Sequence, residues 1–132
     1  KTIVCHAGVT DFDTQYASDV ALLWQDGKMD GSPWRRTKAY EAQNPMTYAS
    51  NFKTPTLVIH GELDYRVPVA QGIVFYAALQ AQGVPSRFVY YPDENHWILK
   101  PQNSVHWYGE VRDWLGRWLG DKAGAAAQKP AQ

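Results

Sequence analysis

A single cysteine, an even balance of charge and the lack of a long apolar run exclude several classes of protein for this chain of 132 residues. Because Cys5 stands alone, no disulfide within the chain and no cysteine-based metal cluster can form, and we expect a small, buried, unreactive thiol. The 13 basic and 13 acidic residues cancel, so the sequence predicts no nucleic-acid partner and no membrane-binding patch. No apolar run reaches the roughly 20 residues that a membrane-spanning helix needs.

An initiator Met and a signal-peptide pattern are also missing from the opening "KTIVCHAGV". We therefore expect a piece of a longer soluble protein, with the bacterial cytoplasm and periplasm both open as its compartment. Residues 1–120 suit part of one domain, and the small, aperiodic stretch 121–132 predicts a disordered tail. What the chain has in abundance is aromatic side chains, with six Trp, eight Tyr and four Phe.

Three short apolar runs, each ending in Gly or Pro, predict β-strands at residues 2–8, 56–61 and 87–92. They are rich in β-branched and aromatic residues and too short to be helices. The first two are apolar throughout, which is typical of parallel strands that are buried on both faces. An edge of this kind is rarely left open, so we expect the sheet to have further strands upstream of the first run.

Two stretches carry apolar residues at helical spacing and predict helices on the faces of this sheet. Pro68 and Gly83 bound the first, whose predicted buried stripe is Val69, Ile73, Tyr76 and Leu79. The second ends at Gly120, and its predicted stripe is Trp107, Val111, Trp114 and Trp118. Residues 14–25 are compatible with another helix, whereas residues 26–45 predict a loop with short helical turns. The fold class is therefore α/β, with about three parallel strands and flanking helices.

The ends of the second and third predicted strands carry the polar residues with the clearest chemical potential. Asp64 lies in "GELDYRVP" after one strand, and His96 lies in "DENHWILKPQNS" after the next. Ligands of open α/β sheets bind at the carboxyl ends of the strands, so both side chains are expected at the same rim. A carboxylate that accepts Nδ1–H from an imidazole leaves Nε2 free as a base. Acid followed by histidine is also the order that α/β-hydrolases use after their nucleophilic serine.

These two motifs carry a resemblance to a known family. The run from "TPTLVIHGELDYRVP" through "YYPDENHWILKPQNS" to "EVRDWLGRWL" resembles the C-terminal part of the catalytic domain of prolyl oligopeptidase-family serine peptidases. The resemblance covers about residues 1–119 and is strongest to the acylaminoacyl peptidase and bacterial dipeptidyl aminopeptidase branch. It implies a partial α/β-hydrolase fold without the N-terminal half of the sheet, short peptides as substrates and no cofactor. It also implies that Asp64 is the triad acid and His96 the triad histidine.

The resemblance assigns two further residues of "DYRVP" to substrate binding. It implies that Arg66 holds a substrate carbonyl, a role that suits the planar donors of a guanidinium. It implies that Val67 lines the pocket for the residue before the scissile bond. The alternative for Arg66 is a structural ion pair with Glu62 or Asp93.

Several other polar residues are expected to be structural. We interpret His60 as packed or hydrogen-bonded to backbone, and we expect Asp93 and Glu94 either to orient the histidine loop or, more simply, to form a solvated turn. His6 and His106 match no metal-binding motif.

The serine that such a triad needs is missing, because none of the five serines lies in a G-x-S-x-G setting: Ser18, Ser32, Ser50, Ser86 and Ser104. We therefore expect a fragment that is inactive alone and has either the missing half of its domain or a second copy as partner. Two alternatives stay open at this point. One is a fragment of an esterase-type α/β-hydrolase, and the other is a non-catalytic module that self-associates through its open sheet edge.

Overall fold

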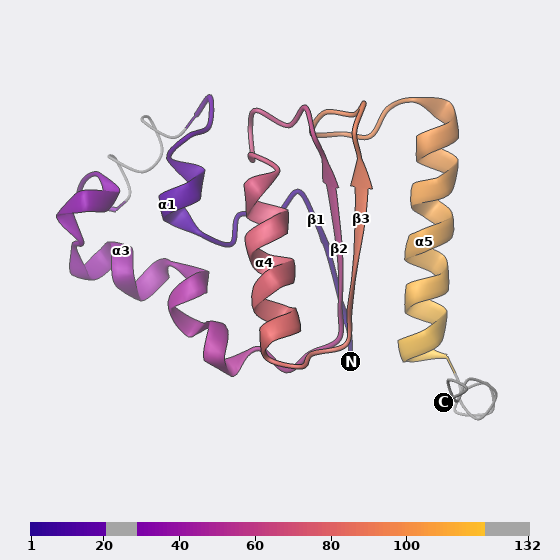
Figure 1. The fold of residues 1–132 in the computed structure, drawn as a ribbon, viewed down its shortest axis with the longest axis horizontal. Helices are drawn as coiled ribbons and strands as arrows, with labels where there is room; N and C mark the ends of the chain where they lie inside the picture. The colour runs from indigo at the N-terminus through magenta and orange to yellow at the C-terminus, as the bar shows by residue number, and fades with distance from the viewer. Residues whose placement is uncertain (21–28, 121–132) are drawn as a thin grey trace.

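The computed structural model describes residues 1–20 and 29–120 and contains a parallel sheet between two layers of helix (Figure 1). Strand β1 spans Ile3–His6, β2 spans Thr56–Gly61 and β3 spans Ser86–Tyr91, in the spatial order β1-β2-β3. All three predicted strands are therefore confirmed. The predicted tail, residues 121–132, lies outside the described residues.

The central and edge strands differ sharply in burial. All six residues of β2 are buried, because β2 has a strand on each side and a helix on each face. In contrast, β1 pairs with β2 alone within the described residues, and Ile3 is 43% exposed. The prediction of burial on both faces is thus confirmed for β2. In β1 it holds in part, since Val4 and Cys5 are half-buried against the two cores, while the outer edge of the strand is open within the described residues, as expected.

Helix α4, Ala70–Ala81, covers one face of the sheet, and its buried stripe matches the predicted one only in part (Figure 1). Its buried residues are Gln71, Gly72, Phe75 and Leu79, whereas Ile73 is 51% exposed. Phe75 and Leu79 pack with Val58 of the central strand. The prediction is therefore confirmed for Leu79 and for Tyr76, which packs against the same core, and it is wrong for Ile73. The polar Gln71 was not counted as a buried position. Gly83 follows the helix with φ 66°, the left-handed conformation that glycine adopts most easily.

Helix α5, Pro101–Leu119, covers the opposite face of the sheet (Figure 1). Trp114 is buried against Leu57 and Ile59 of β2 and Val89 of β3. The remaining members of the predicted stripe pack beside it, namely Trp107, Val111 and Trp118. The predicted aromatic face of this helix is therefore confirmed as core.

The segment between β1 and β2 forms a small helical layer beside α4 (Figure 1). It comprises α1 (Phe12–Gln15), η1 (Pro33–Arg35), α3 (Lys38–Gln43) and η2 (Pro45–Asn51). Phe12, Met29 and Tyr40 form its own core. The short helical turns predicted for residues 26–45 are confirmed where they are described. The possible helix over 14–25 is wrong for residues 16–20, which form turns, and residues 21–28 lie outside the described part.

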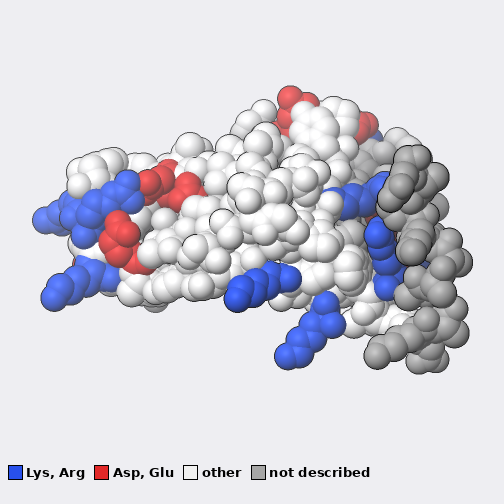
Figure 2. All heavy atoms as spheres, turned by 60° about the horizontal axis from the view of Figure 1, so that its bottom comes forward, with Lys and Arg blue, Asp and Glu red and all other residues white. Residues whose placement is uncertain are grey.

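No helix within residues 1–20 and 29–120 is both long and apolar enough to span a bilayer. On the face shown in Figure 2, basic side chains stand at several separate places around a broad uncharged centre. Cys5 is partly buried, and this burial raises the pKa of its thiol, as expected for a packed cysteine.

Candidate active site

The loop that carries Asp64 begins at the last residue of β2 and turns around the carboxylate. Asp64 Oδ1 accepts hydrogen bonds from the backbone N–H groups of Arg66, at 3.0 Å, and Val67, at 2.8 Å. The side chain of Asp64 is fully buried. A buried carboxylate needs such donors, since an unpaired one carries a large desolvation cost. The backbone of the loop therefore folds back onto the carboxylate of Asp64.

The loop that carries His96 follows β3 and is held by a different buried carboxylate, that of Glu94. Glu94 accepts from the N–H groups of Leu99 and Lys100, each at 2.9 Å, and from Asn103 Nδ2 at 2.7 Å. Burial acts to raise the pKa of Glu94, but these hydrogen bonds outweigh it and hold the pKa below its usual value. The expectation that Glu94 forms a solvated turn was wrong, and the alternative that it orients the histidine loop fits the contacts.

The same loop contains a backbone outlier. Ile98 is buried and has φ 49°, a left-handed conformation that is strained for a β-branched residue. Its carbonyl accepts a hydrogen bond from Ser104 Oγ of α5 at 2.7 Å. The strained turn lies two residues after His96, so α5 and Glu94 together fix the course of the histidine loop.

The two loops are joined to each other by their backbones. The N–H of Glu62 donates to the carbonyl of Tyr91, and the N–H of Leu63 donates to that of Glu94, each at 2.9 Å. The approach is so close that a Cβ on Gly61 would lie 2.5 Å from the carbonyl oxygens of Glu94 and Asn95. Only glycine fits at this position without a backbone shift.

Asp64 and His96 meet at this rim. His96 Nδ1 donates to Asp64 Oδ2 at 2.8 Å, and the His96 side chain is 28% exposed. The bond fixes the tautomer of His96, so Nε2 carries the free lone pair. The arrangement is chemically a general base oriented by a buried carboxylate.

Arg66 and Val67 lie next to this pair but differ in exposure. The Arg66 side chain is half exposed, and its Nε lies 3.4 Å from Asp19 Oδ1. Neither Glu62 nor Asp93 is the carboxylate in this contact, so the predicted structural pairing was wrong in its partner. Val67 is buried, and its carbonyl accepts from His60 Nε2 at 2.7 Å. The substrate-binding roles of Arg66 and Val67 stay predictions.

His60 and His106 have structural surroundings. His60 is buried and bonded to backbone, as expected. His106 Nδ1 bonds to the hydroxyl of Tyr91 at 2.9 Å, and its Nε2 lies 3.4 Å from Glu110. Within residues 1–20 and 29–120, no group of three or more His, Cys, Asp or Glu side chains is arranged to hold a metal ion.

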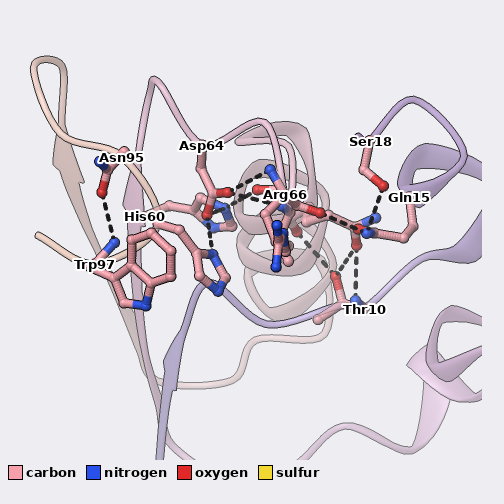
Figure 3. A network of polar contacts seen from close by, with 11 residues as sticks. Thr10, Gln15, Ser18, His60, Asp64, Arg66, Asn95 and Trp97 are labelled. Carbon is pink, nitrogen blue, oxygen red and sulfur yellow. Dashed lines mark hydrogen bonds and ion pairs between the residues drawn. The ribbon is translucent and has the colours of Figure 1, made fainter. Parts of the chain in front are cut away.

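Sequence reasoning missed two glutamines, of which one anchors the acid loop and the other anchors the segment after β1. Gln15 Nε2 donates to the carbonyl of Arg66 at 2.9 Å (Figure 3). Gln71 Oε1 accepts from the N–H groups of Thr10 and Asp11, each at 2.8 Å, and ties the end of β1 to the start of α4. The spacing of Gln71 with Phe75 and Leu79, four residues apart each time, was the available signal that this glutamine faces inward.

Comparisons with known proteins agree on one family. The family model described as the prolyl oligopeptidase family matches residues 1–122. Dipeptidyl-peptidase 5 of Porphyromonas endodontalis is 38% identical over 120 residues, which cover 88% of this chain and 17% of that protein. Dipeptidyl-peptidase 5 of Schizosaccharomyces pombe is 36% identical over 121 residues, covering 92% of this chain and 18% of that protein. The chain therefore spans less than a fifth of the length of these relatives.

Solved structures give the same answer for the fold. The uncomplexed acylaminoacyl peptidase of Pyrococcus horikoshii matches with a TM-score of 0.80 and 25% identity, over 98% of this chain and 21% of that one. A puromycin-hydrolysing peptidase of Mycobacterium tuberculosis matches with a TM-score of 0.77 and 22% identity, over 90% and 18% of the two chains. The parallel sheet with its flanking helices is accordingly a partial α/β-hydrolase fold. Together with the family match, these likenesses show that this chain belongs to the prolyl oligopeptidase family.

Proposed function

We propose that this chain supplies the acid and the general base of a Ser-His-Asp triad in a longer serine peptidase that hydrolyses short peptides. The observation that carries the proposal is the 2.8 Å bond between His96 Nδ1 and Asp64 Oδ2, with the acid buried and the imidazole partly open. The names of the related proteins support peptides as the substrate class, since they include dipeptidyl and acylaminoacyl peptidases.

The proposed chemistry follows from the fixed tautomer. His96 Nε2 takes the proton of a serine hydroxyl as its oxygen attacks the peptide carbonyl, and Asp64 stabilises the imidazolium that forms. The proton then passes to the leaving amine as the C–N bond breaks, which leaves an acyl-enzyme. Water attacks the acyl group with His96 again acting as base, and the serine is regenerated. No metal or organic cofactor takes part in these steps.

Arg66 and Val67 complete the proposed site on the substrate side. The half-exposed guanidinium of Arg66 has a surface contact to Asp19, and such contacts contribute little to stability. Its remaining donors are suited to a substrate carbonyl. Val67 is proposed to shape the wall of the pocket for the residue before the scissile bond.

We propose the missing half of the catalytic domain as the partner of the β1 edge. The half-exposed Ile3 and the open hydrogen-bonding side of β1 provide a surface on which a further parallel strand would be buried. Size-exclusion chromatography of the 132-residue chain, with and without the co-expressed preceding part of the parent, is expected to give a stable one-to-one complex. A chain that remains a monomer in both samples would contradict this proposal, and a homodimer would favour a second copy as partner.

Kinetics of the longer parent enzyme test the site assignment directly. Asp64→Ala and His96→Ala are each expected to lower kcat for a short peptide by about 10³-fold or more, whereas the 132-residue chain alone is expected to be inactive. His106→Ala is a matched control, because this histidine also bonds to neighbouring side chains but lies away from the Asp64–His96 pair. Near-normal turnover in either of the first two variants would refute the assignment.

A further inference from the structure

Asp64 has a second imidazole beside it, and the proposed triad does not use that group. His60 Nε2 lies 3.5 Å from Asp64 Oδ2, the same oxygen that accepts from His96 (Figure 3). Both side chains are essentially inaccessible to solvent. Two histidines, one buried and one open, therefore face a single carboxylate oxygen.

The hydrogen bonds of His60 define its protonation state. Its Nε2 lies 2.7 Å from the carbonyl oxygen of Val67, and a carbonyl only accepts, so Nε2 carries the proton. Its Nδ1 is buried and has no hydrogen-bond partner among the described residues. A proton on Nδ1 would have no acceptor, and burial lowers the pKa of His60 accordingly. His60 is thus a neutral imidazole whose single N–H points at the acid loop.

Gly72 of α4 holds the opposite side of this ring. A Cβ on Gly72 would lie 2.7 Å from His60 Nδ1 and 3.1 Å from the ring of Phe88. The helix therefore approaches the imidazole as closely as a glycine permits, and the ring is clamped between α4 and the carbonyl of Val67. A side chain that is held on both sides is able to set the position of what it contacts.

We propose that His60 is a positioning residue for the triad acid, with Gly72 as its backing. Its Nε2–H closes the turn of residues 61–67 by binding the Val67 carbonyl, and the N–H of Val67 in turn binds Asp64 Oδ1. The same N–H edge of His60 lies beside Oδ2 and keeps that oxygen directed at His96. The inference rests on the proposed function, because it concerns the acid of the proposed triad.

Two variants of His60 in the parent enzyme test the role through kcat and KM. His60→Leu is expected to lower kcat by about 10–100-fold with little change in KM, since small displacements of catalytic groups have effects of this size. His60→Gln retains an N–H donor near the Nε2 position and is expected to restore most of kcat. Equal losses in the Leu and Gln variants, or a change confined to KM, would overturn the proposal.

A second pair of variants perturbs the imidazole of His60 without replacing it. This pair tests the positioning role even if His60→Leu does not fold. Gly72→Ala pushes on Nδ1 and is expected to lower kcat in the same manner. Gly109→Ala is the matched control, since Gly109 is also a helix glycine but its Cβ would meet nothing within 4 Å. Unchanged kcat in Gly72→Ala would contradict the clamped arrangement.

A spectroscopic readout separates this inference from the proposed function. The proton that His96 Nδ1 shares with Asp64 is expected to give a downfield proton NMR signal in the parent enzyme, where it can be observed without turnover. His60→Gln is expected to retain that signal, and Gly72→Ala is expected to shift or broaden it. An unchanged signal in Gly72→Ala would count against His60 as a positioning residue, whereas a parent without peptidase activity would count only against the proposed function.

Discussion

Asp64 and His96 lie 2.8 Å apart, yet the loops that carry them are built differently. Asp64 has no exposed side-chain surface, and its carboxylate is bound by two N–H groups of its own loop. His96 is 28% exposed, and its loop is held by a neighbouring residue, Glu94, rather than by the histidine itself.

The Asp64 carboxylate is therefore fixed by its own loop, whereas the His96 imidazole is accessible. The Asp64 carboxylate is buried and binds the backbone of its own loop, so we expect its removal to disturb both folding and chemistry. The loop of His96 is anchored through Glu94, so the imidazole of His96 remains free to face a substrate. We expect stability and activity to respond differently to substitutions in the two loops.

The largest contrast in stability is expected between Asp64 and His96, the two proposed triad positions. Asp64→Ala leaves the buried N–H groups of Arg66 and Val67 without their acceptor and is expected to lower the free energy of unfolding by about 3 kcal/mol. His96→Ala removes a partly exposed side chain and is expected to cost less than about 1 kcal/mol. Urea unfolding followed by tryptophan fluorescence measures both values. Equal losses would remove the distinction between the loops.

The junction of the two loops is expected to be the next most sensitive point. Gly61→Ala places a Cβ against the backbone carbonyls of Glu94 and Asn95 and is expected to destabilise the protein by about 1–3 kcal/mol. Gly116→Ala in α5 is the control, because its Cβ would meet nothing within 4 Å, and it is expected to be neutral or to stabilise the helix by up to about 1 kcal/mol. Thermal unfolding of both variants checks this. A tolerant Gly61 would mean that the loops are less tightly joined than their hydrogen bonds indicate.

The histidine loop is expected to weaken in acid through Glu94. Hydrogen bonding holds the pKa of Glu94 below its ordinary value of 4.5 despite burial, so its stabilising effect is full above pH 4.5 and is lost as the pH falls through the lower folded value. Glu94→Gln is expected to cost about 1–2 kcal/mol at pH 7, with the difference from the native chain shrinking below pH 4.5. Unfolding free energies measured from pH 3 to pH 7 test this. A difference that is independent of pH would show that the charge of Glu94 is unimportant.

The smallest effect is expected at the rim of the acid loop. Asp19→Asn removes the surface ion pair with Arg66 and is expected to change stability by less than about 1 kcal/mol.

Arg66→Met in the parent enzyme is expected to raise KM for a short peptide about tenfold, the loss of one charge-assisted hydrogen bond, while stability stays nearly constant. An unchanged KM would contradict the proposed contact between Arg66 and the substrate.

The parts of the fold that the sequence predicts well are those that local patterns determine. The run "TLVIHG" coincides with β2, because its apolar residues end at a glycine. The meeting of Asp64 and His96 follows from a general property of parallel sheets, whose neighbouring strands end at one rim. The aromatic residues of α5 recur at helical spacing, so the pattern predicts which side of the helix is buried.

The parts that the sequence does not predict depend on contacts between distant residues. Gln71 is buried because the backbone of Thr10 and Asp11, some 60 positions earlier, satisfies its amide. Asp19 and Arg66 come together only when the segment after β1 folds over the acid loop. The support of Asp64 by His60 and Gly72 likewise requires β2 and α4 to be packed together. No local pattern carries that information.

A fluorophosphonate labels a serine that a triad has activated, so labelling of the longer parent enzyme tests whether His96 is the base for a serine outside this chain. We expect the labelled serine, mapped by mass spectrometry, to lie outside residues 1–132 and His96→Ala to slow its labelling by about 10³-fold or more. Labelling of a serine within residues 1–132, or an undiminished rate in His96→Ala, would contradict this expectation.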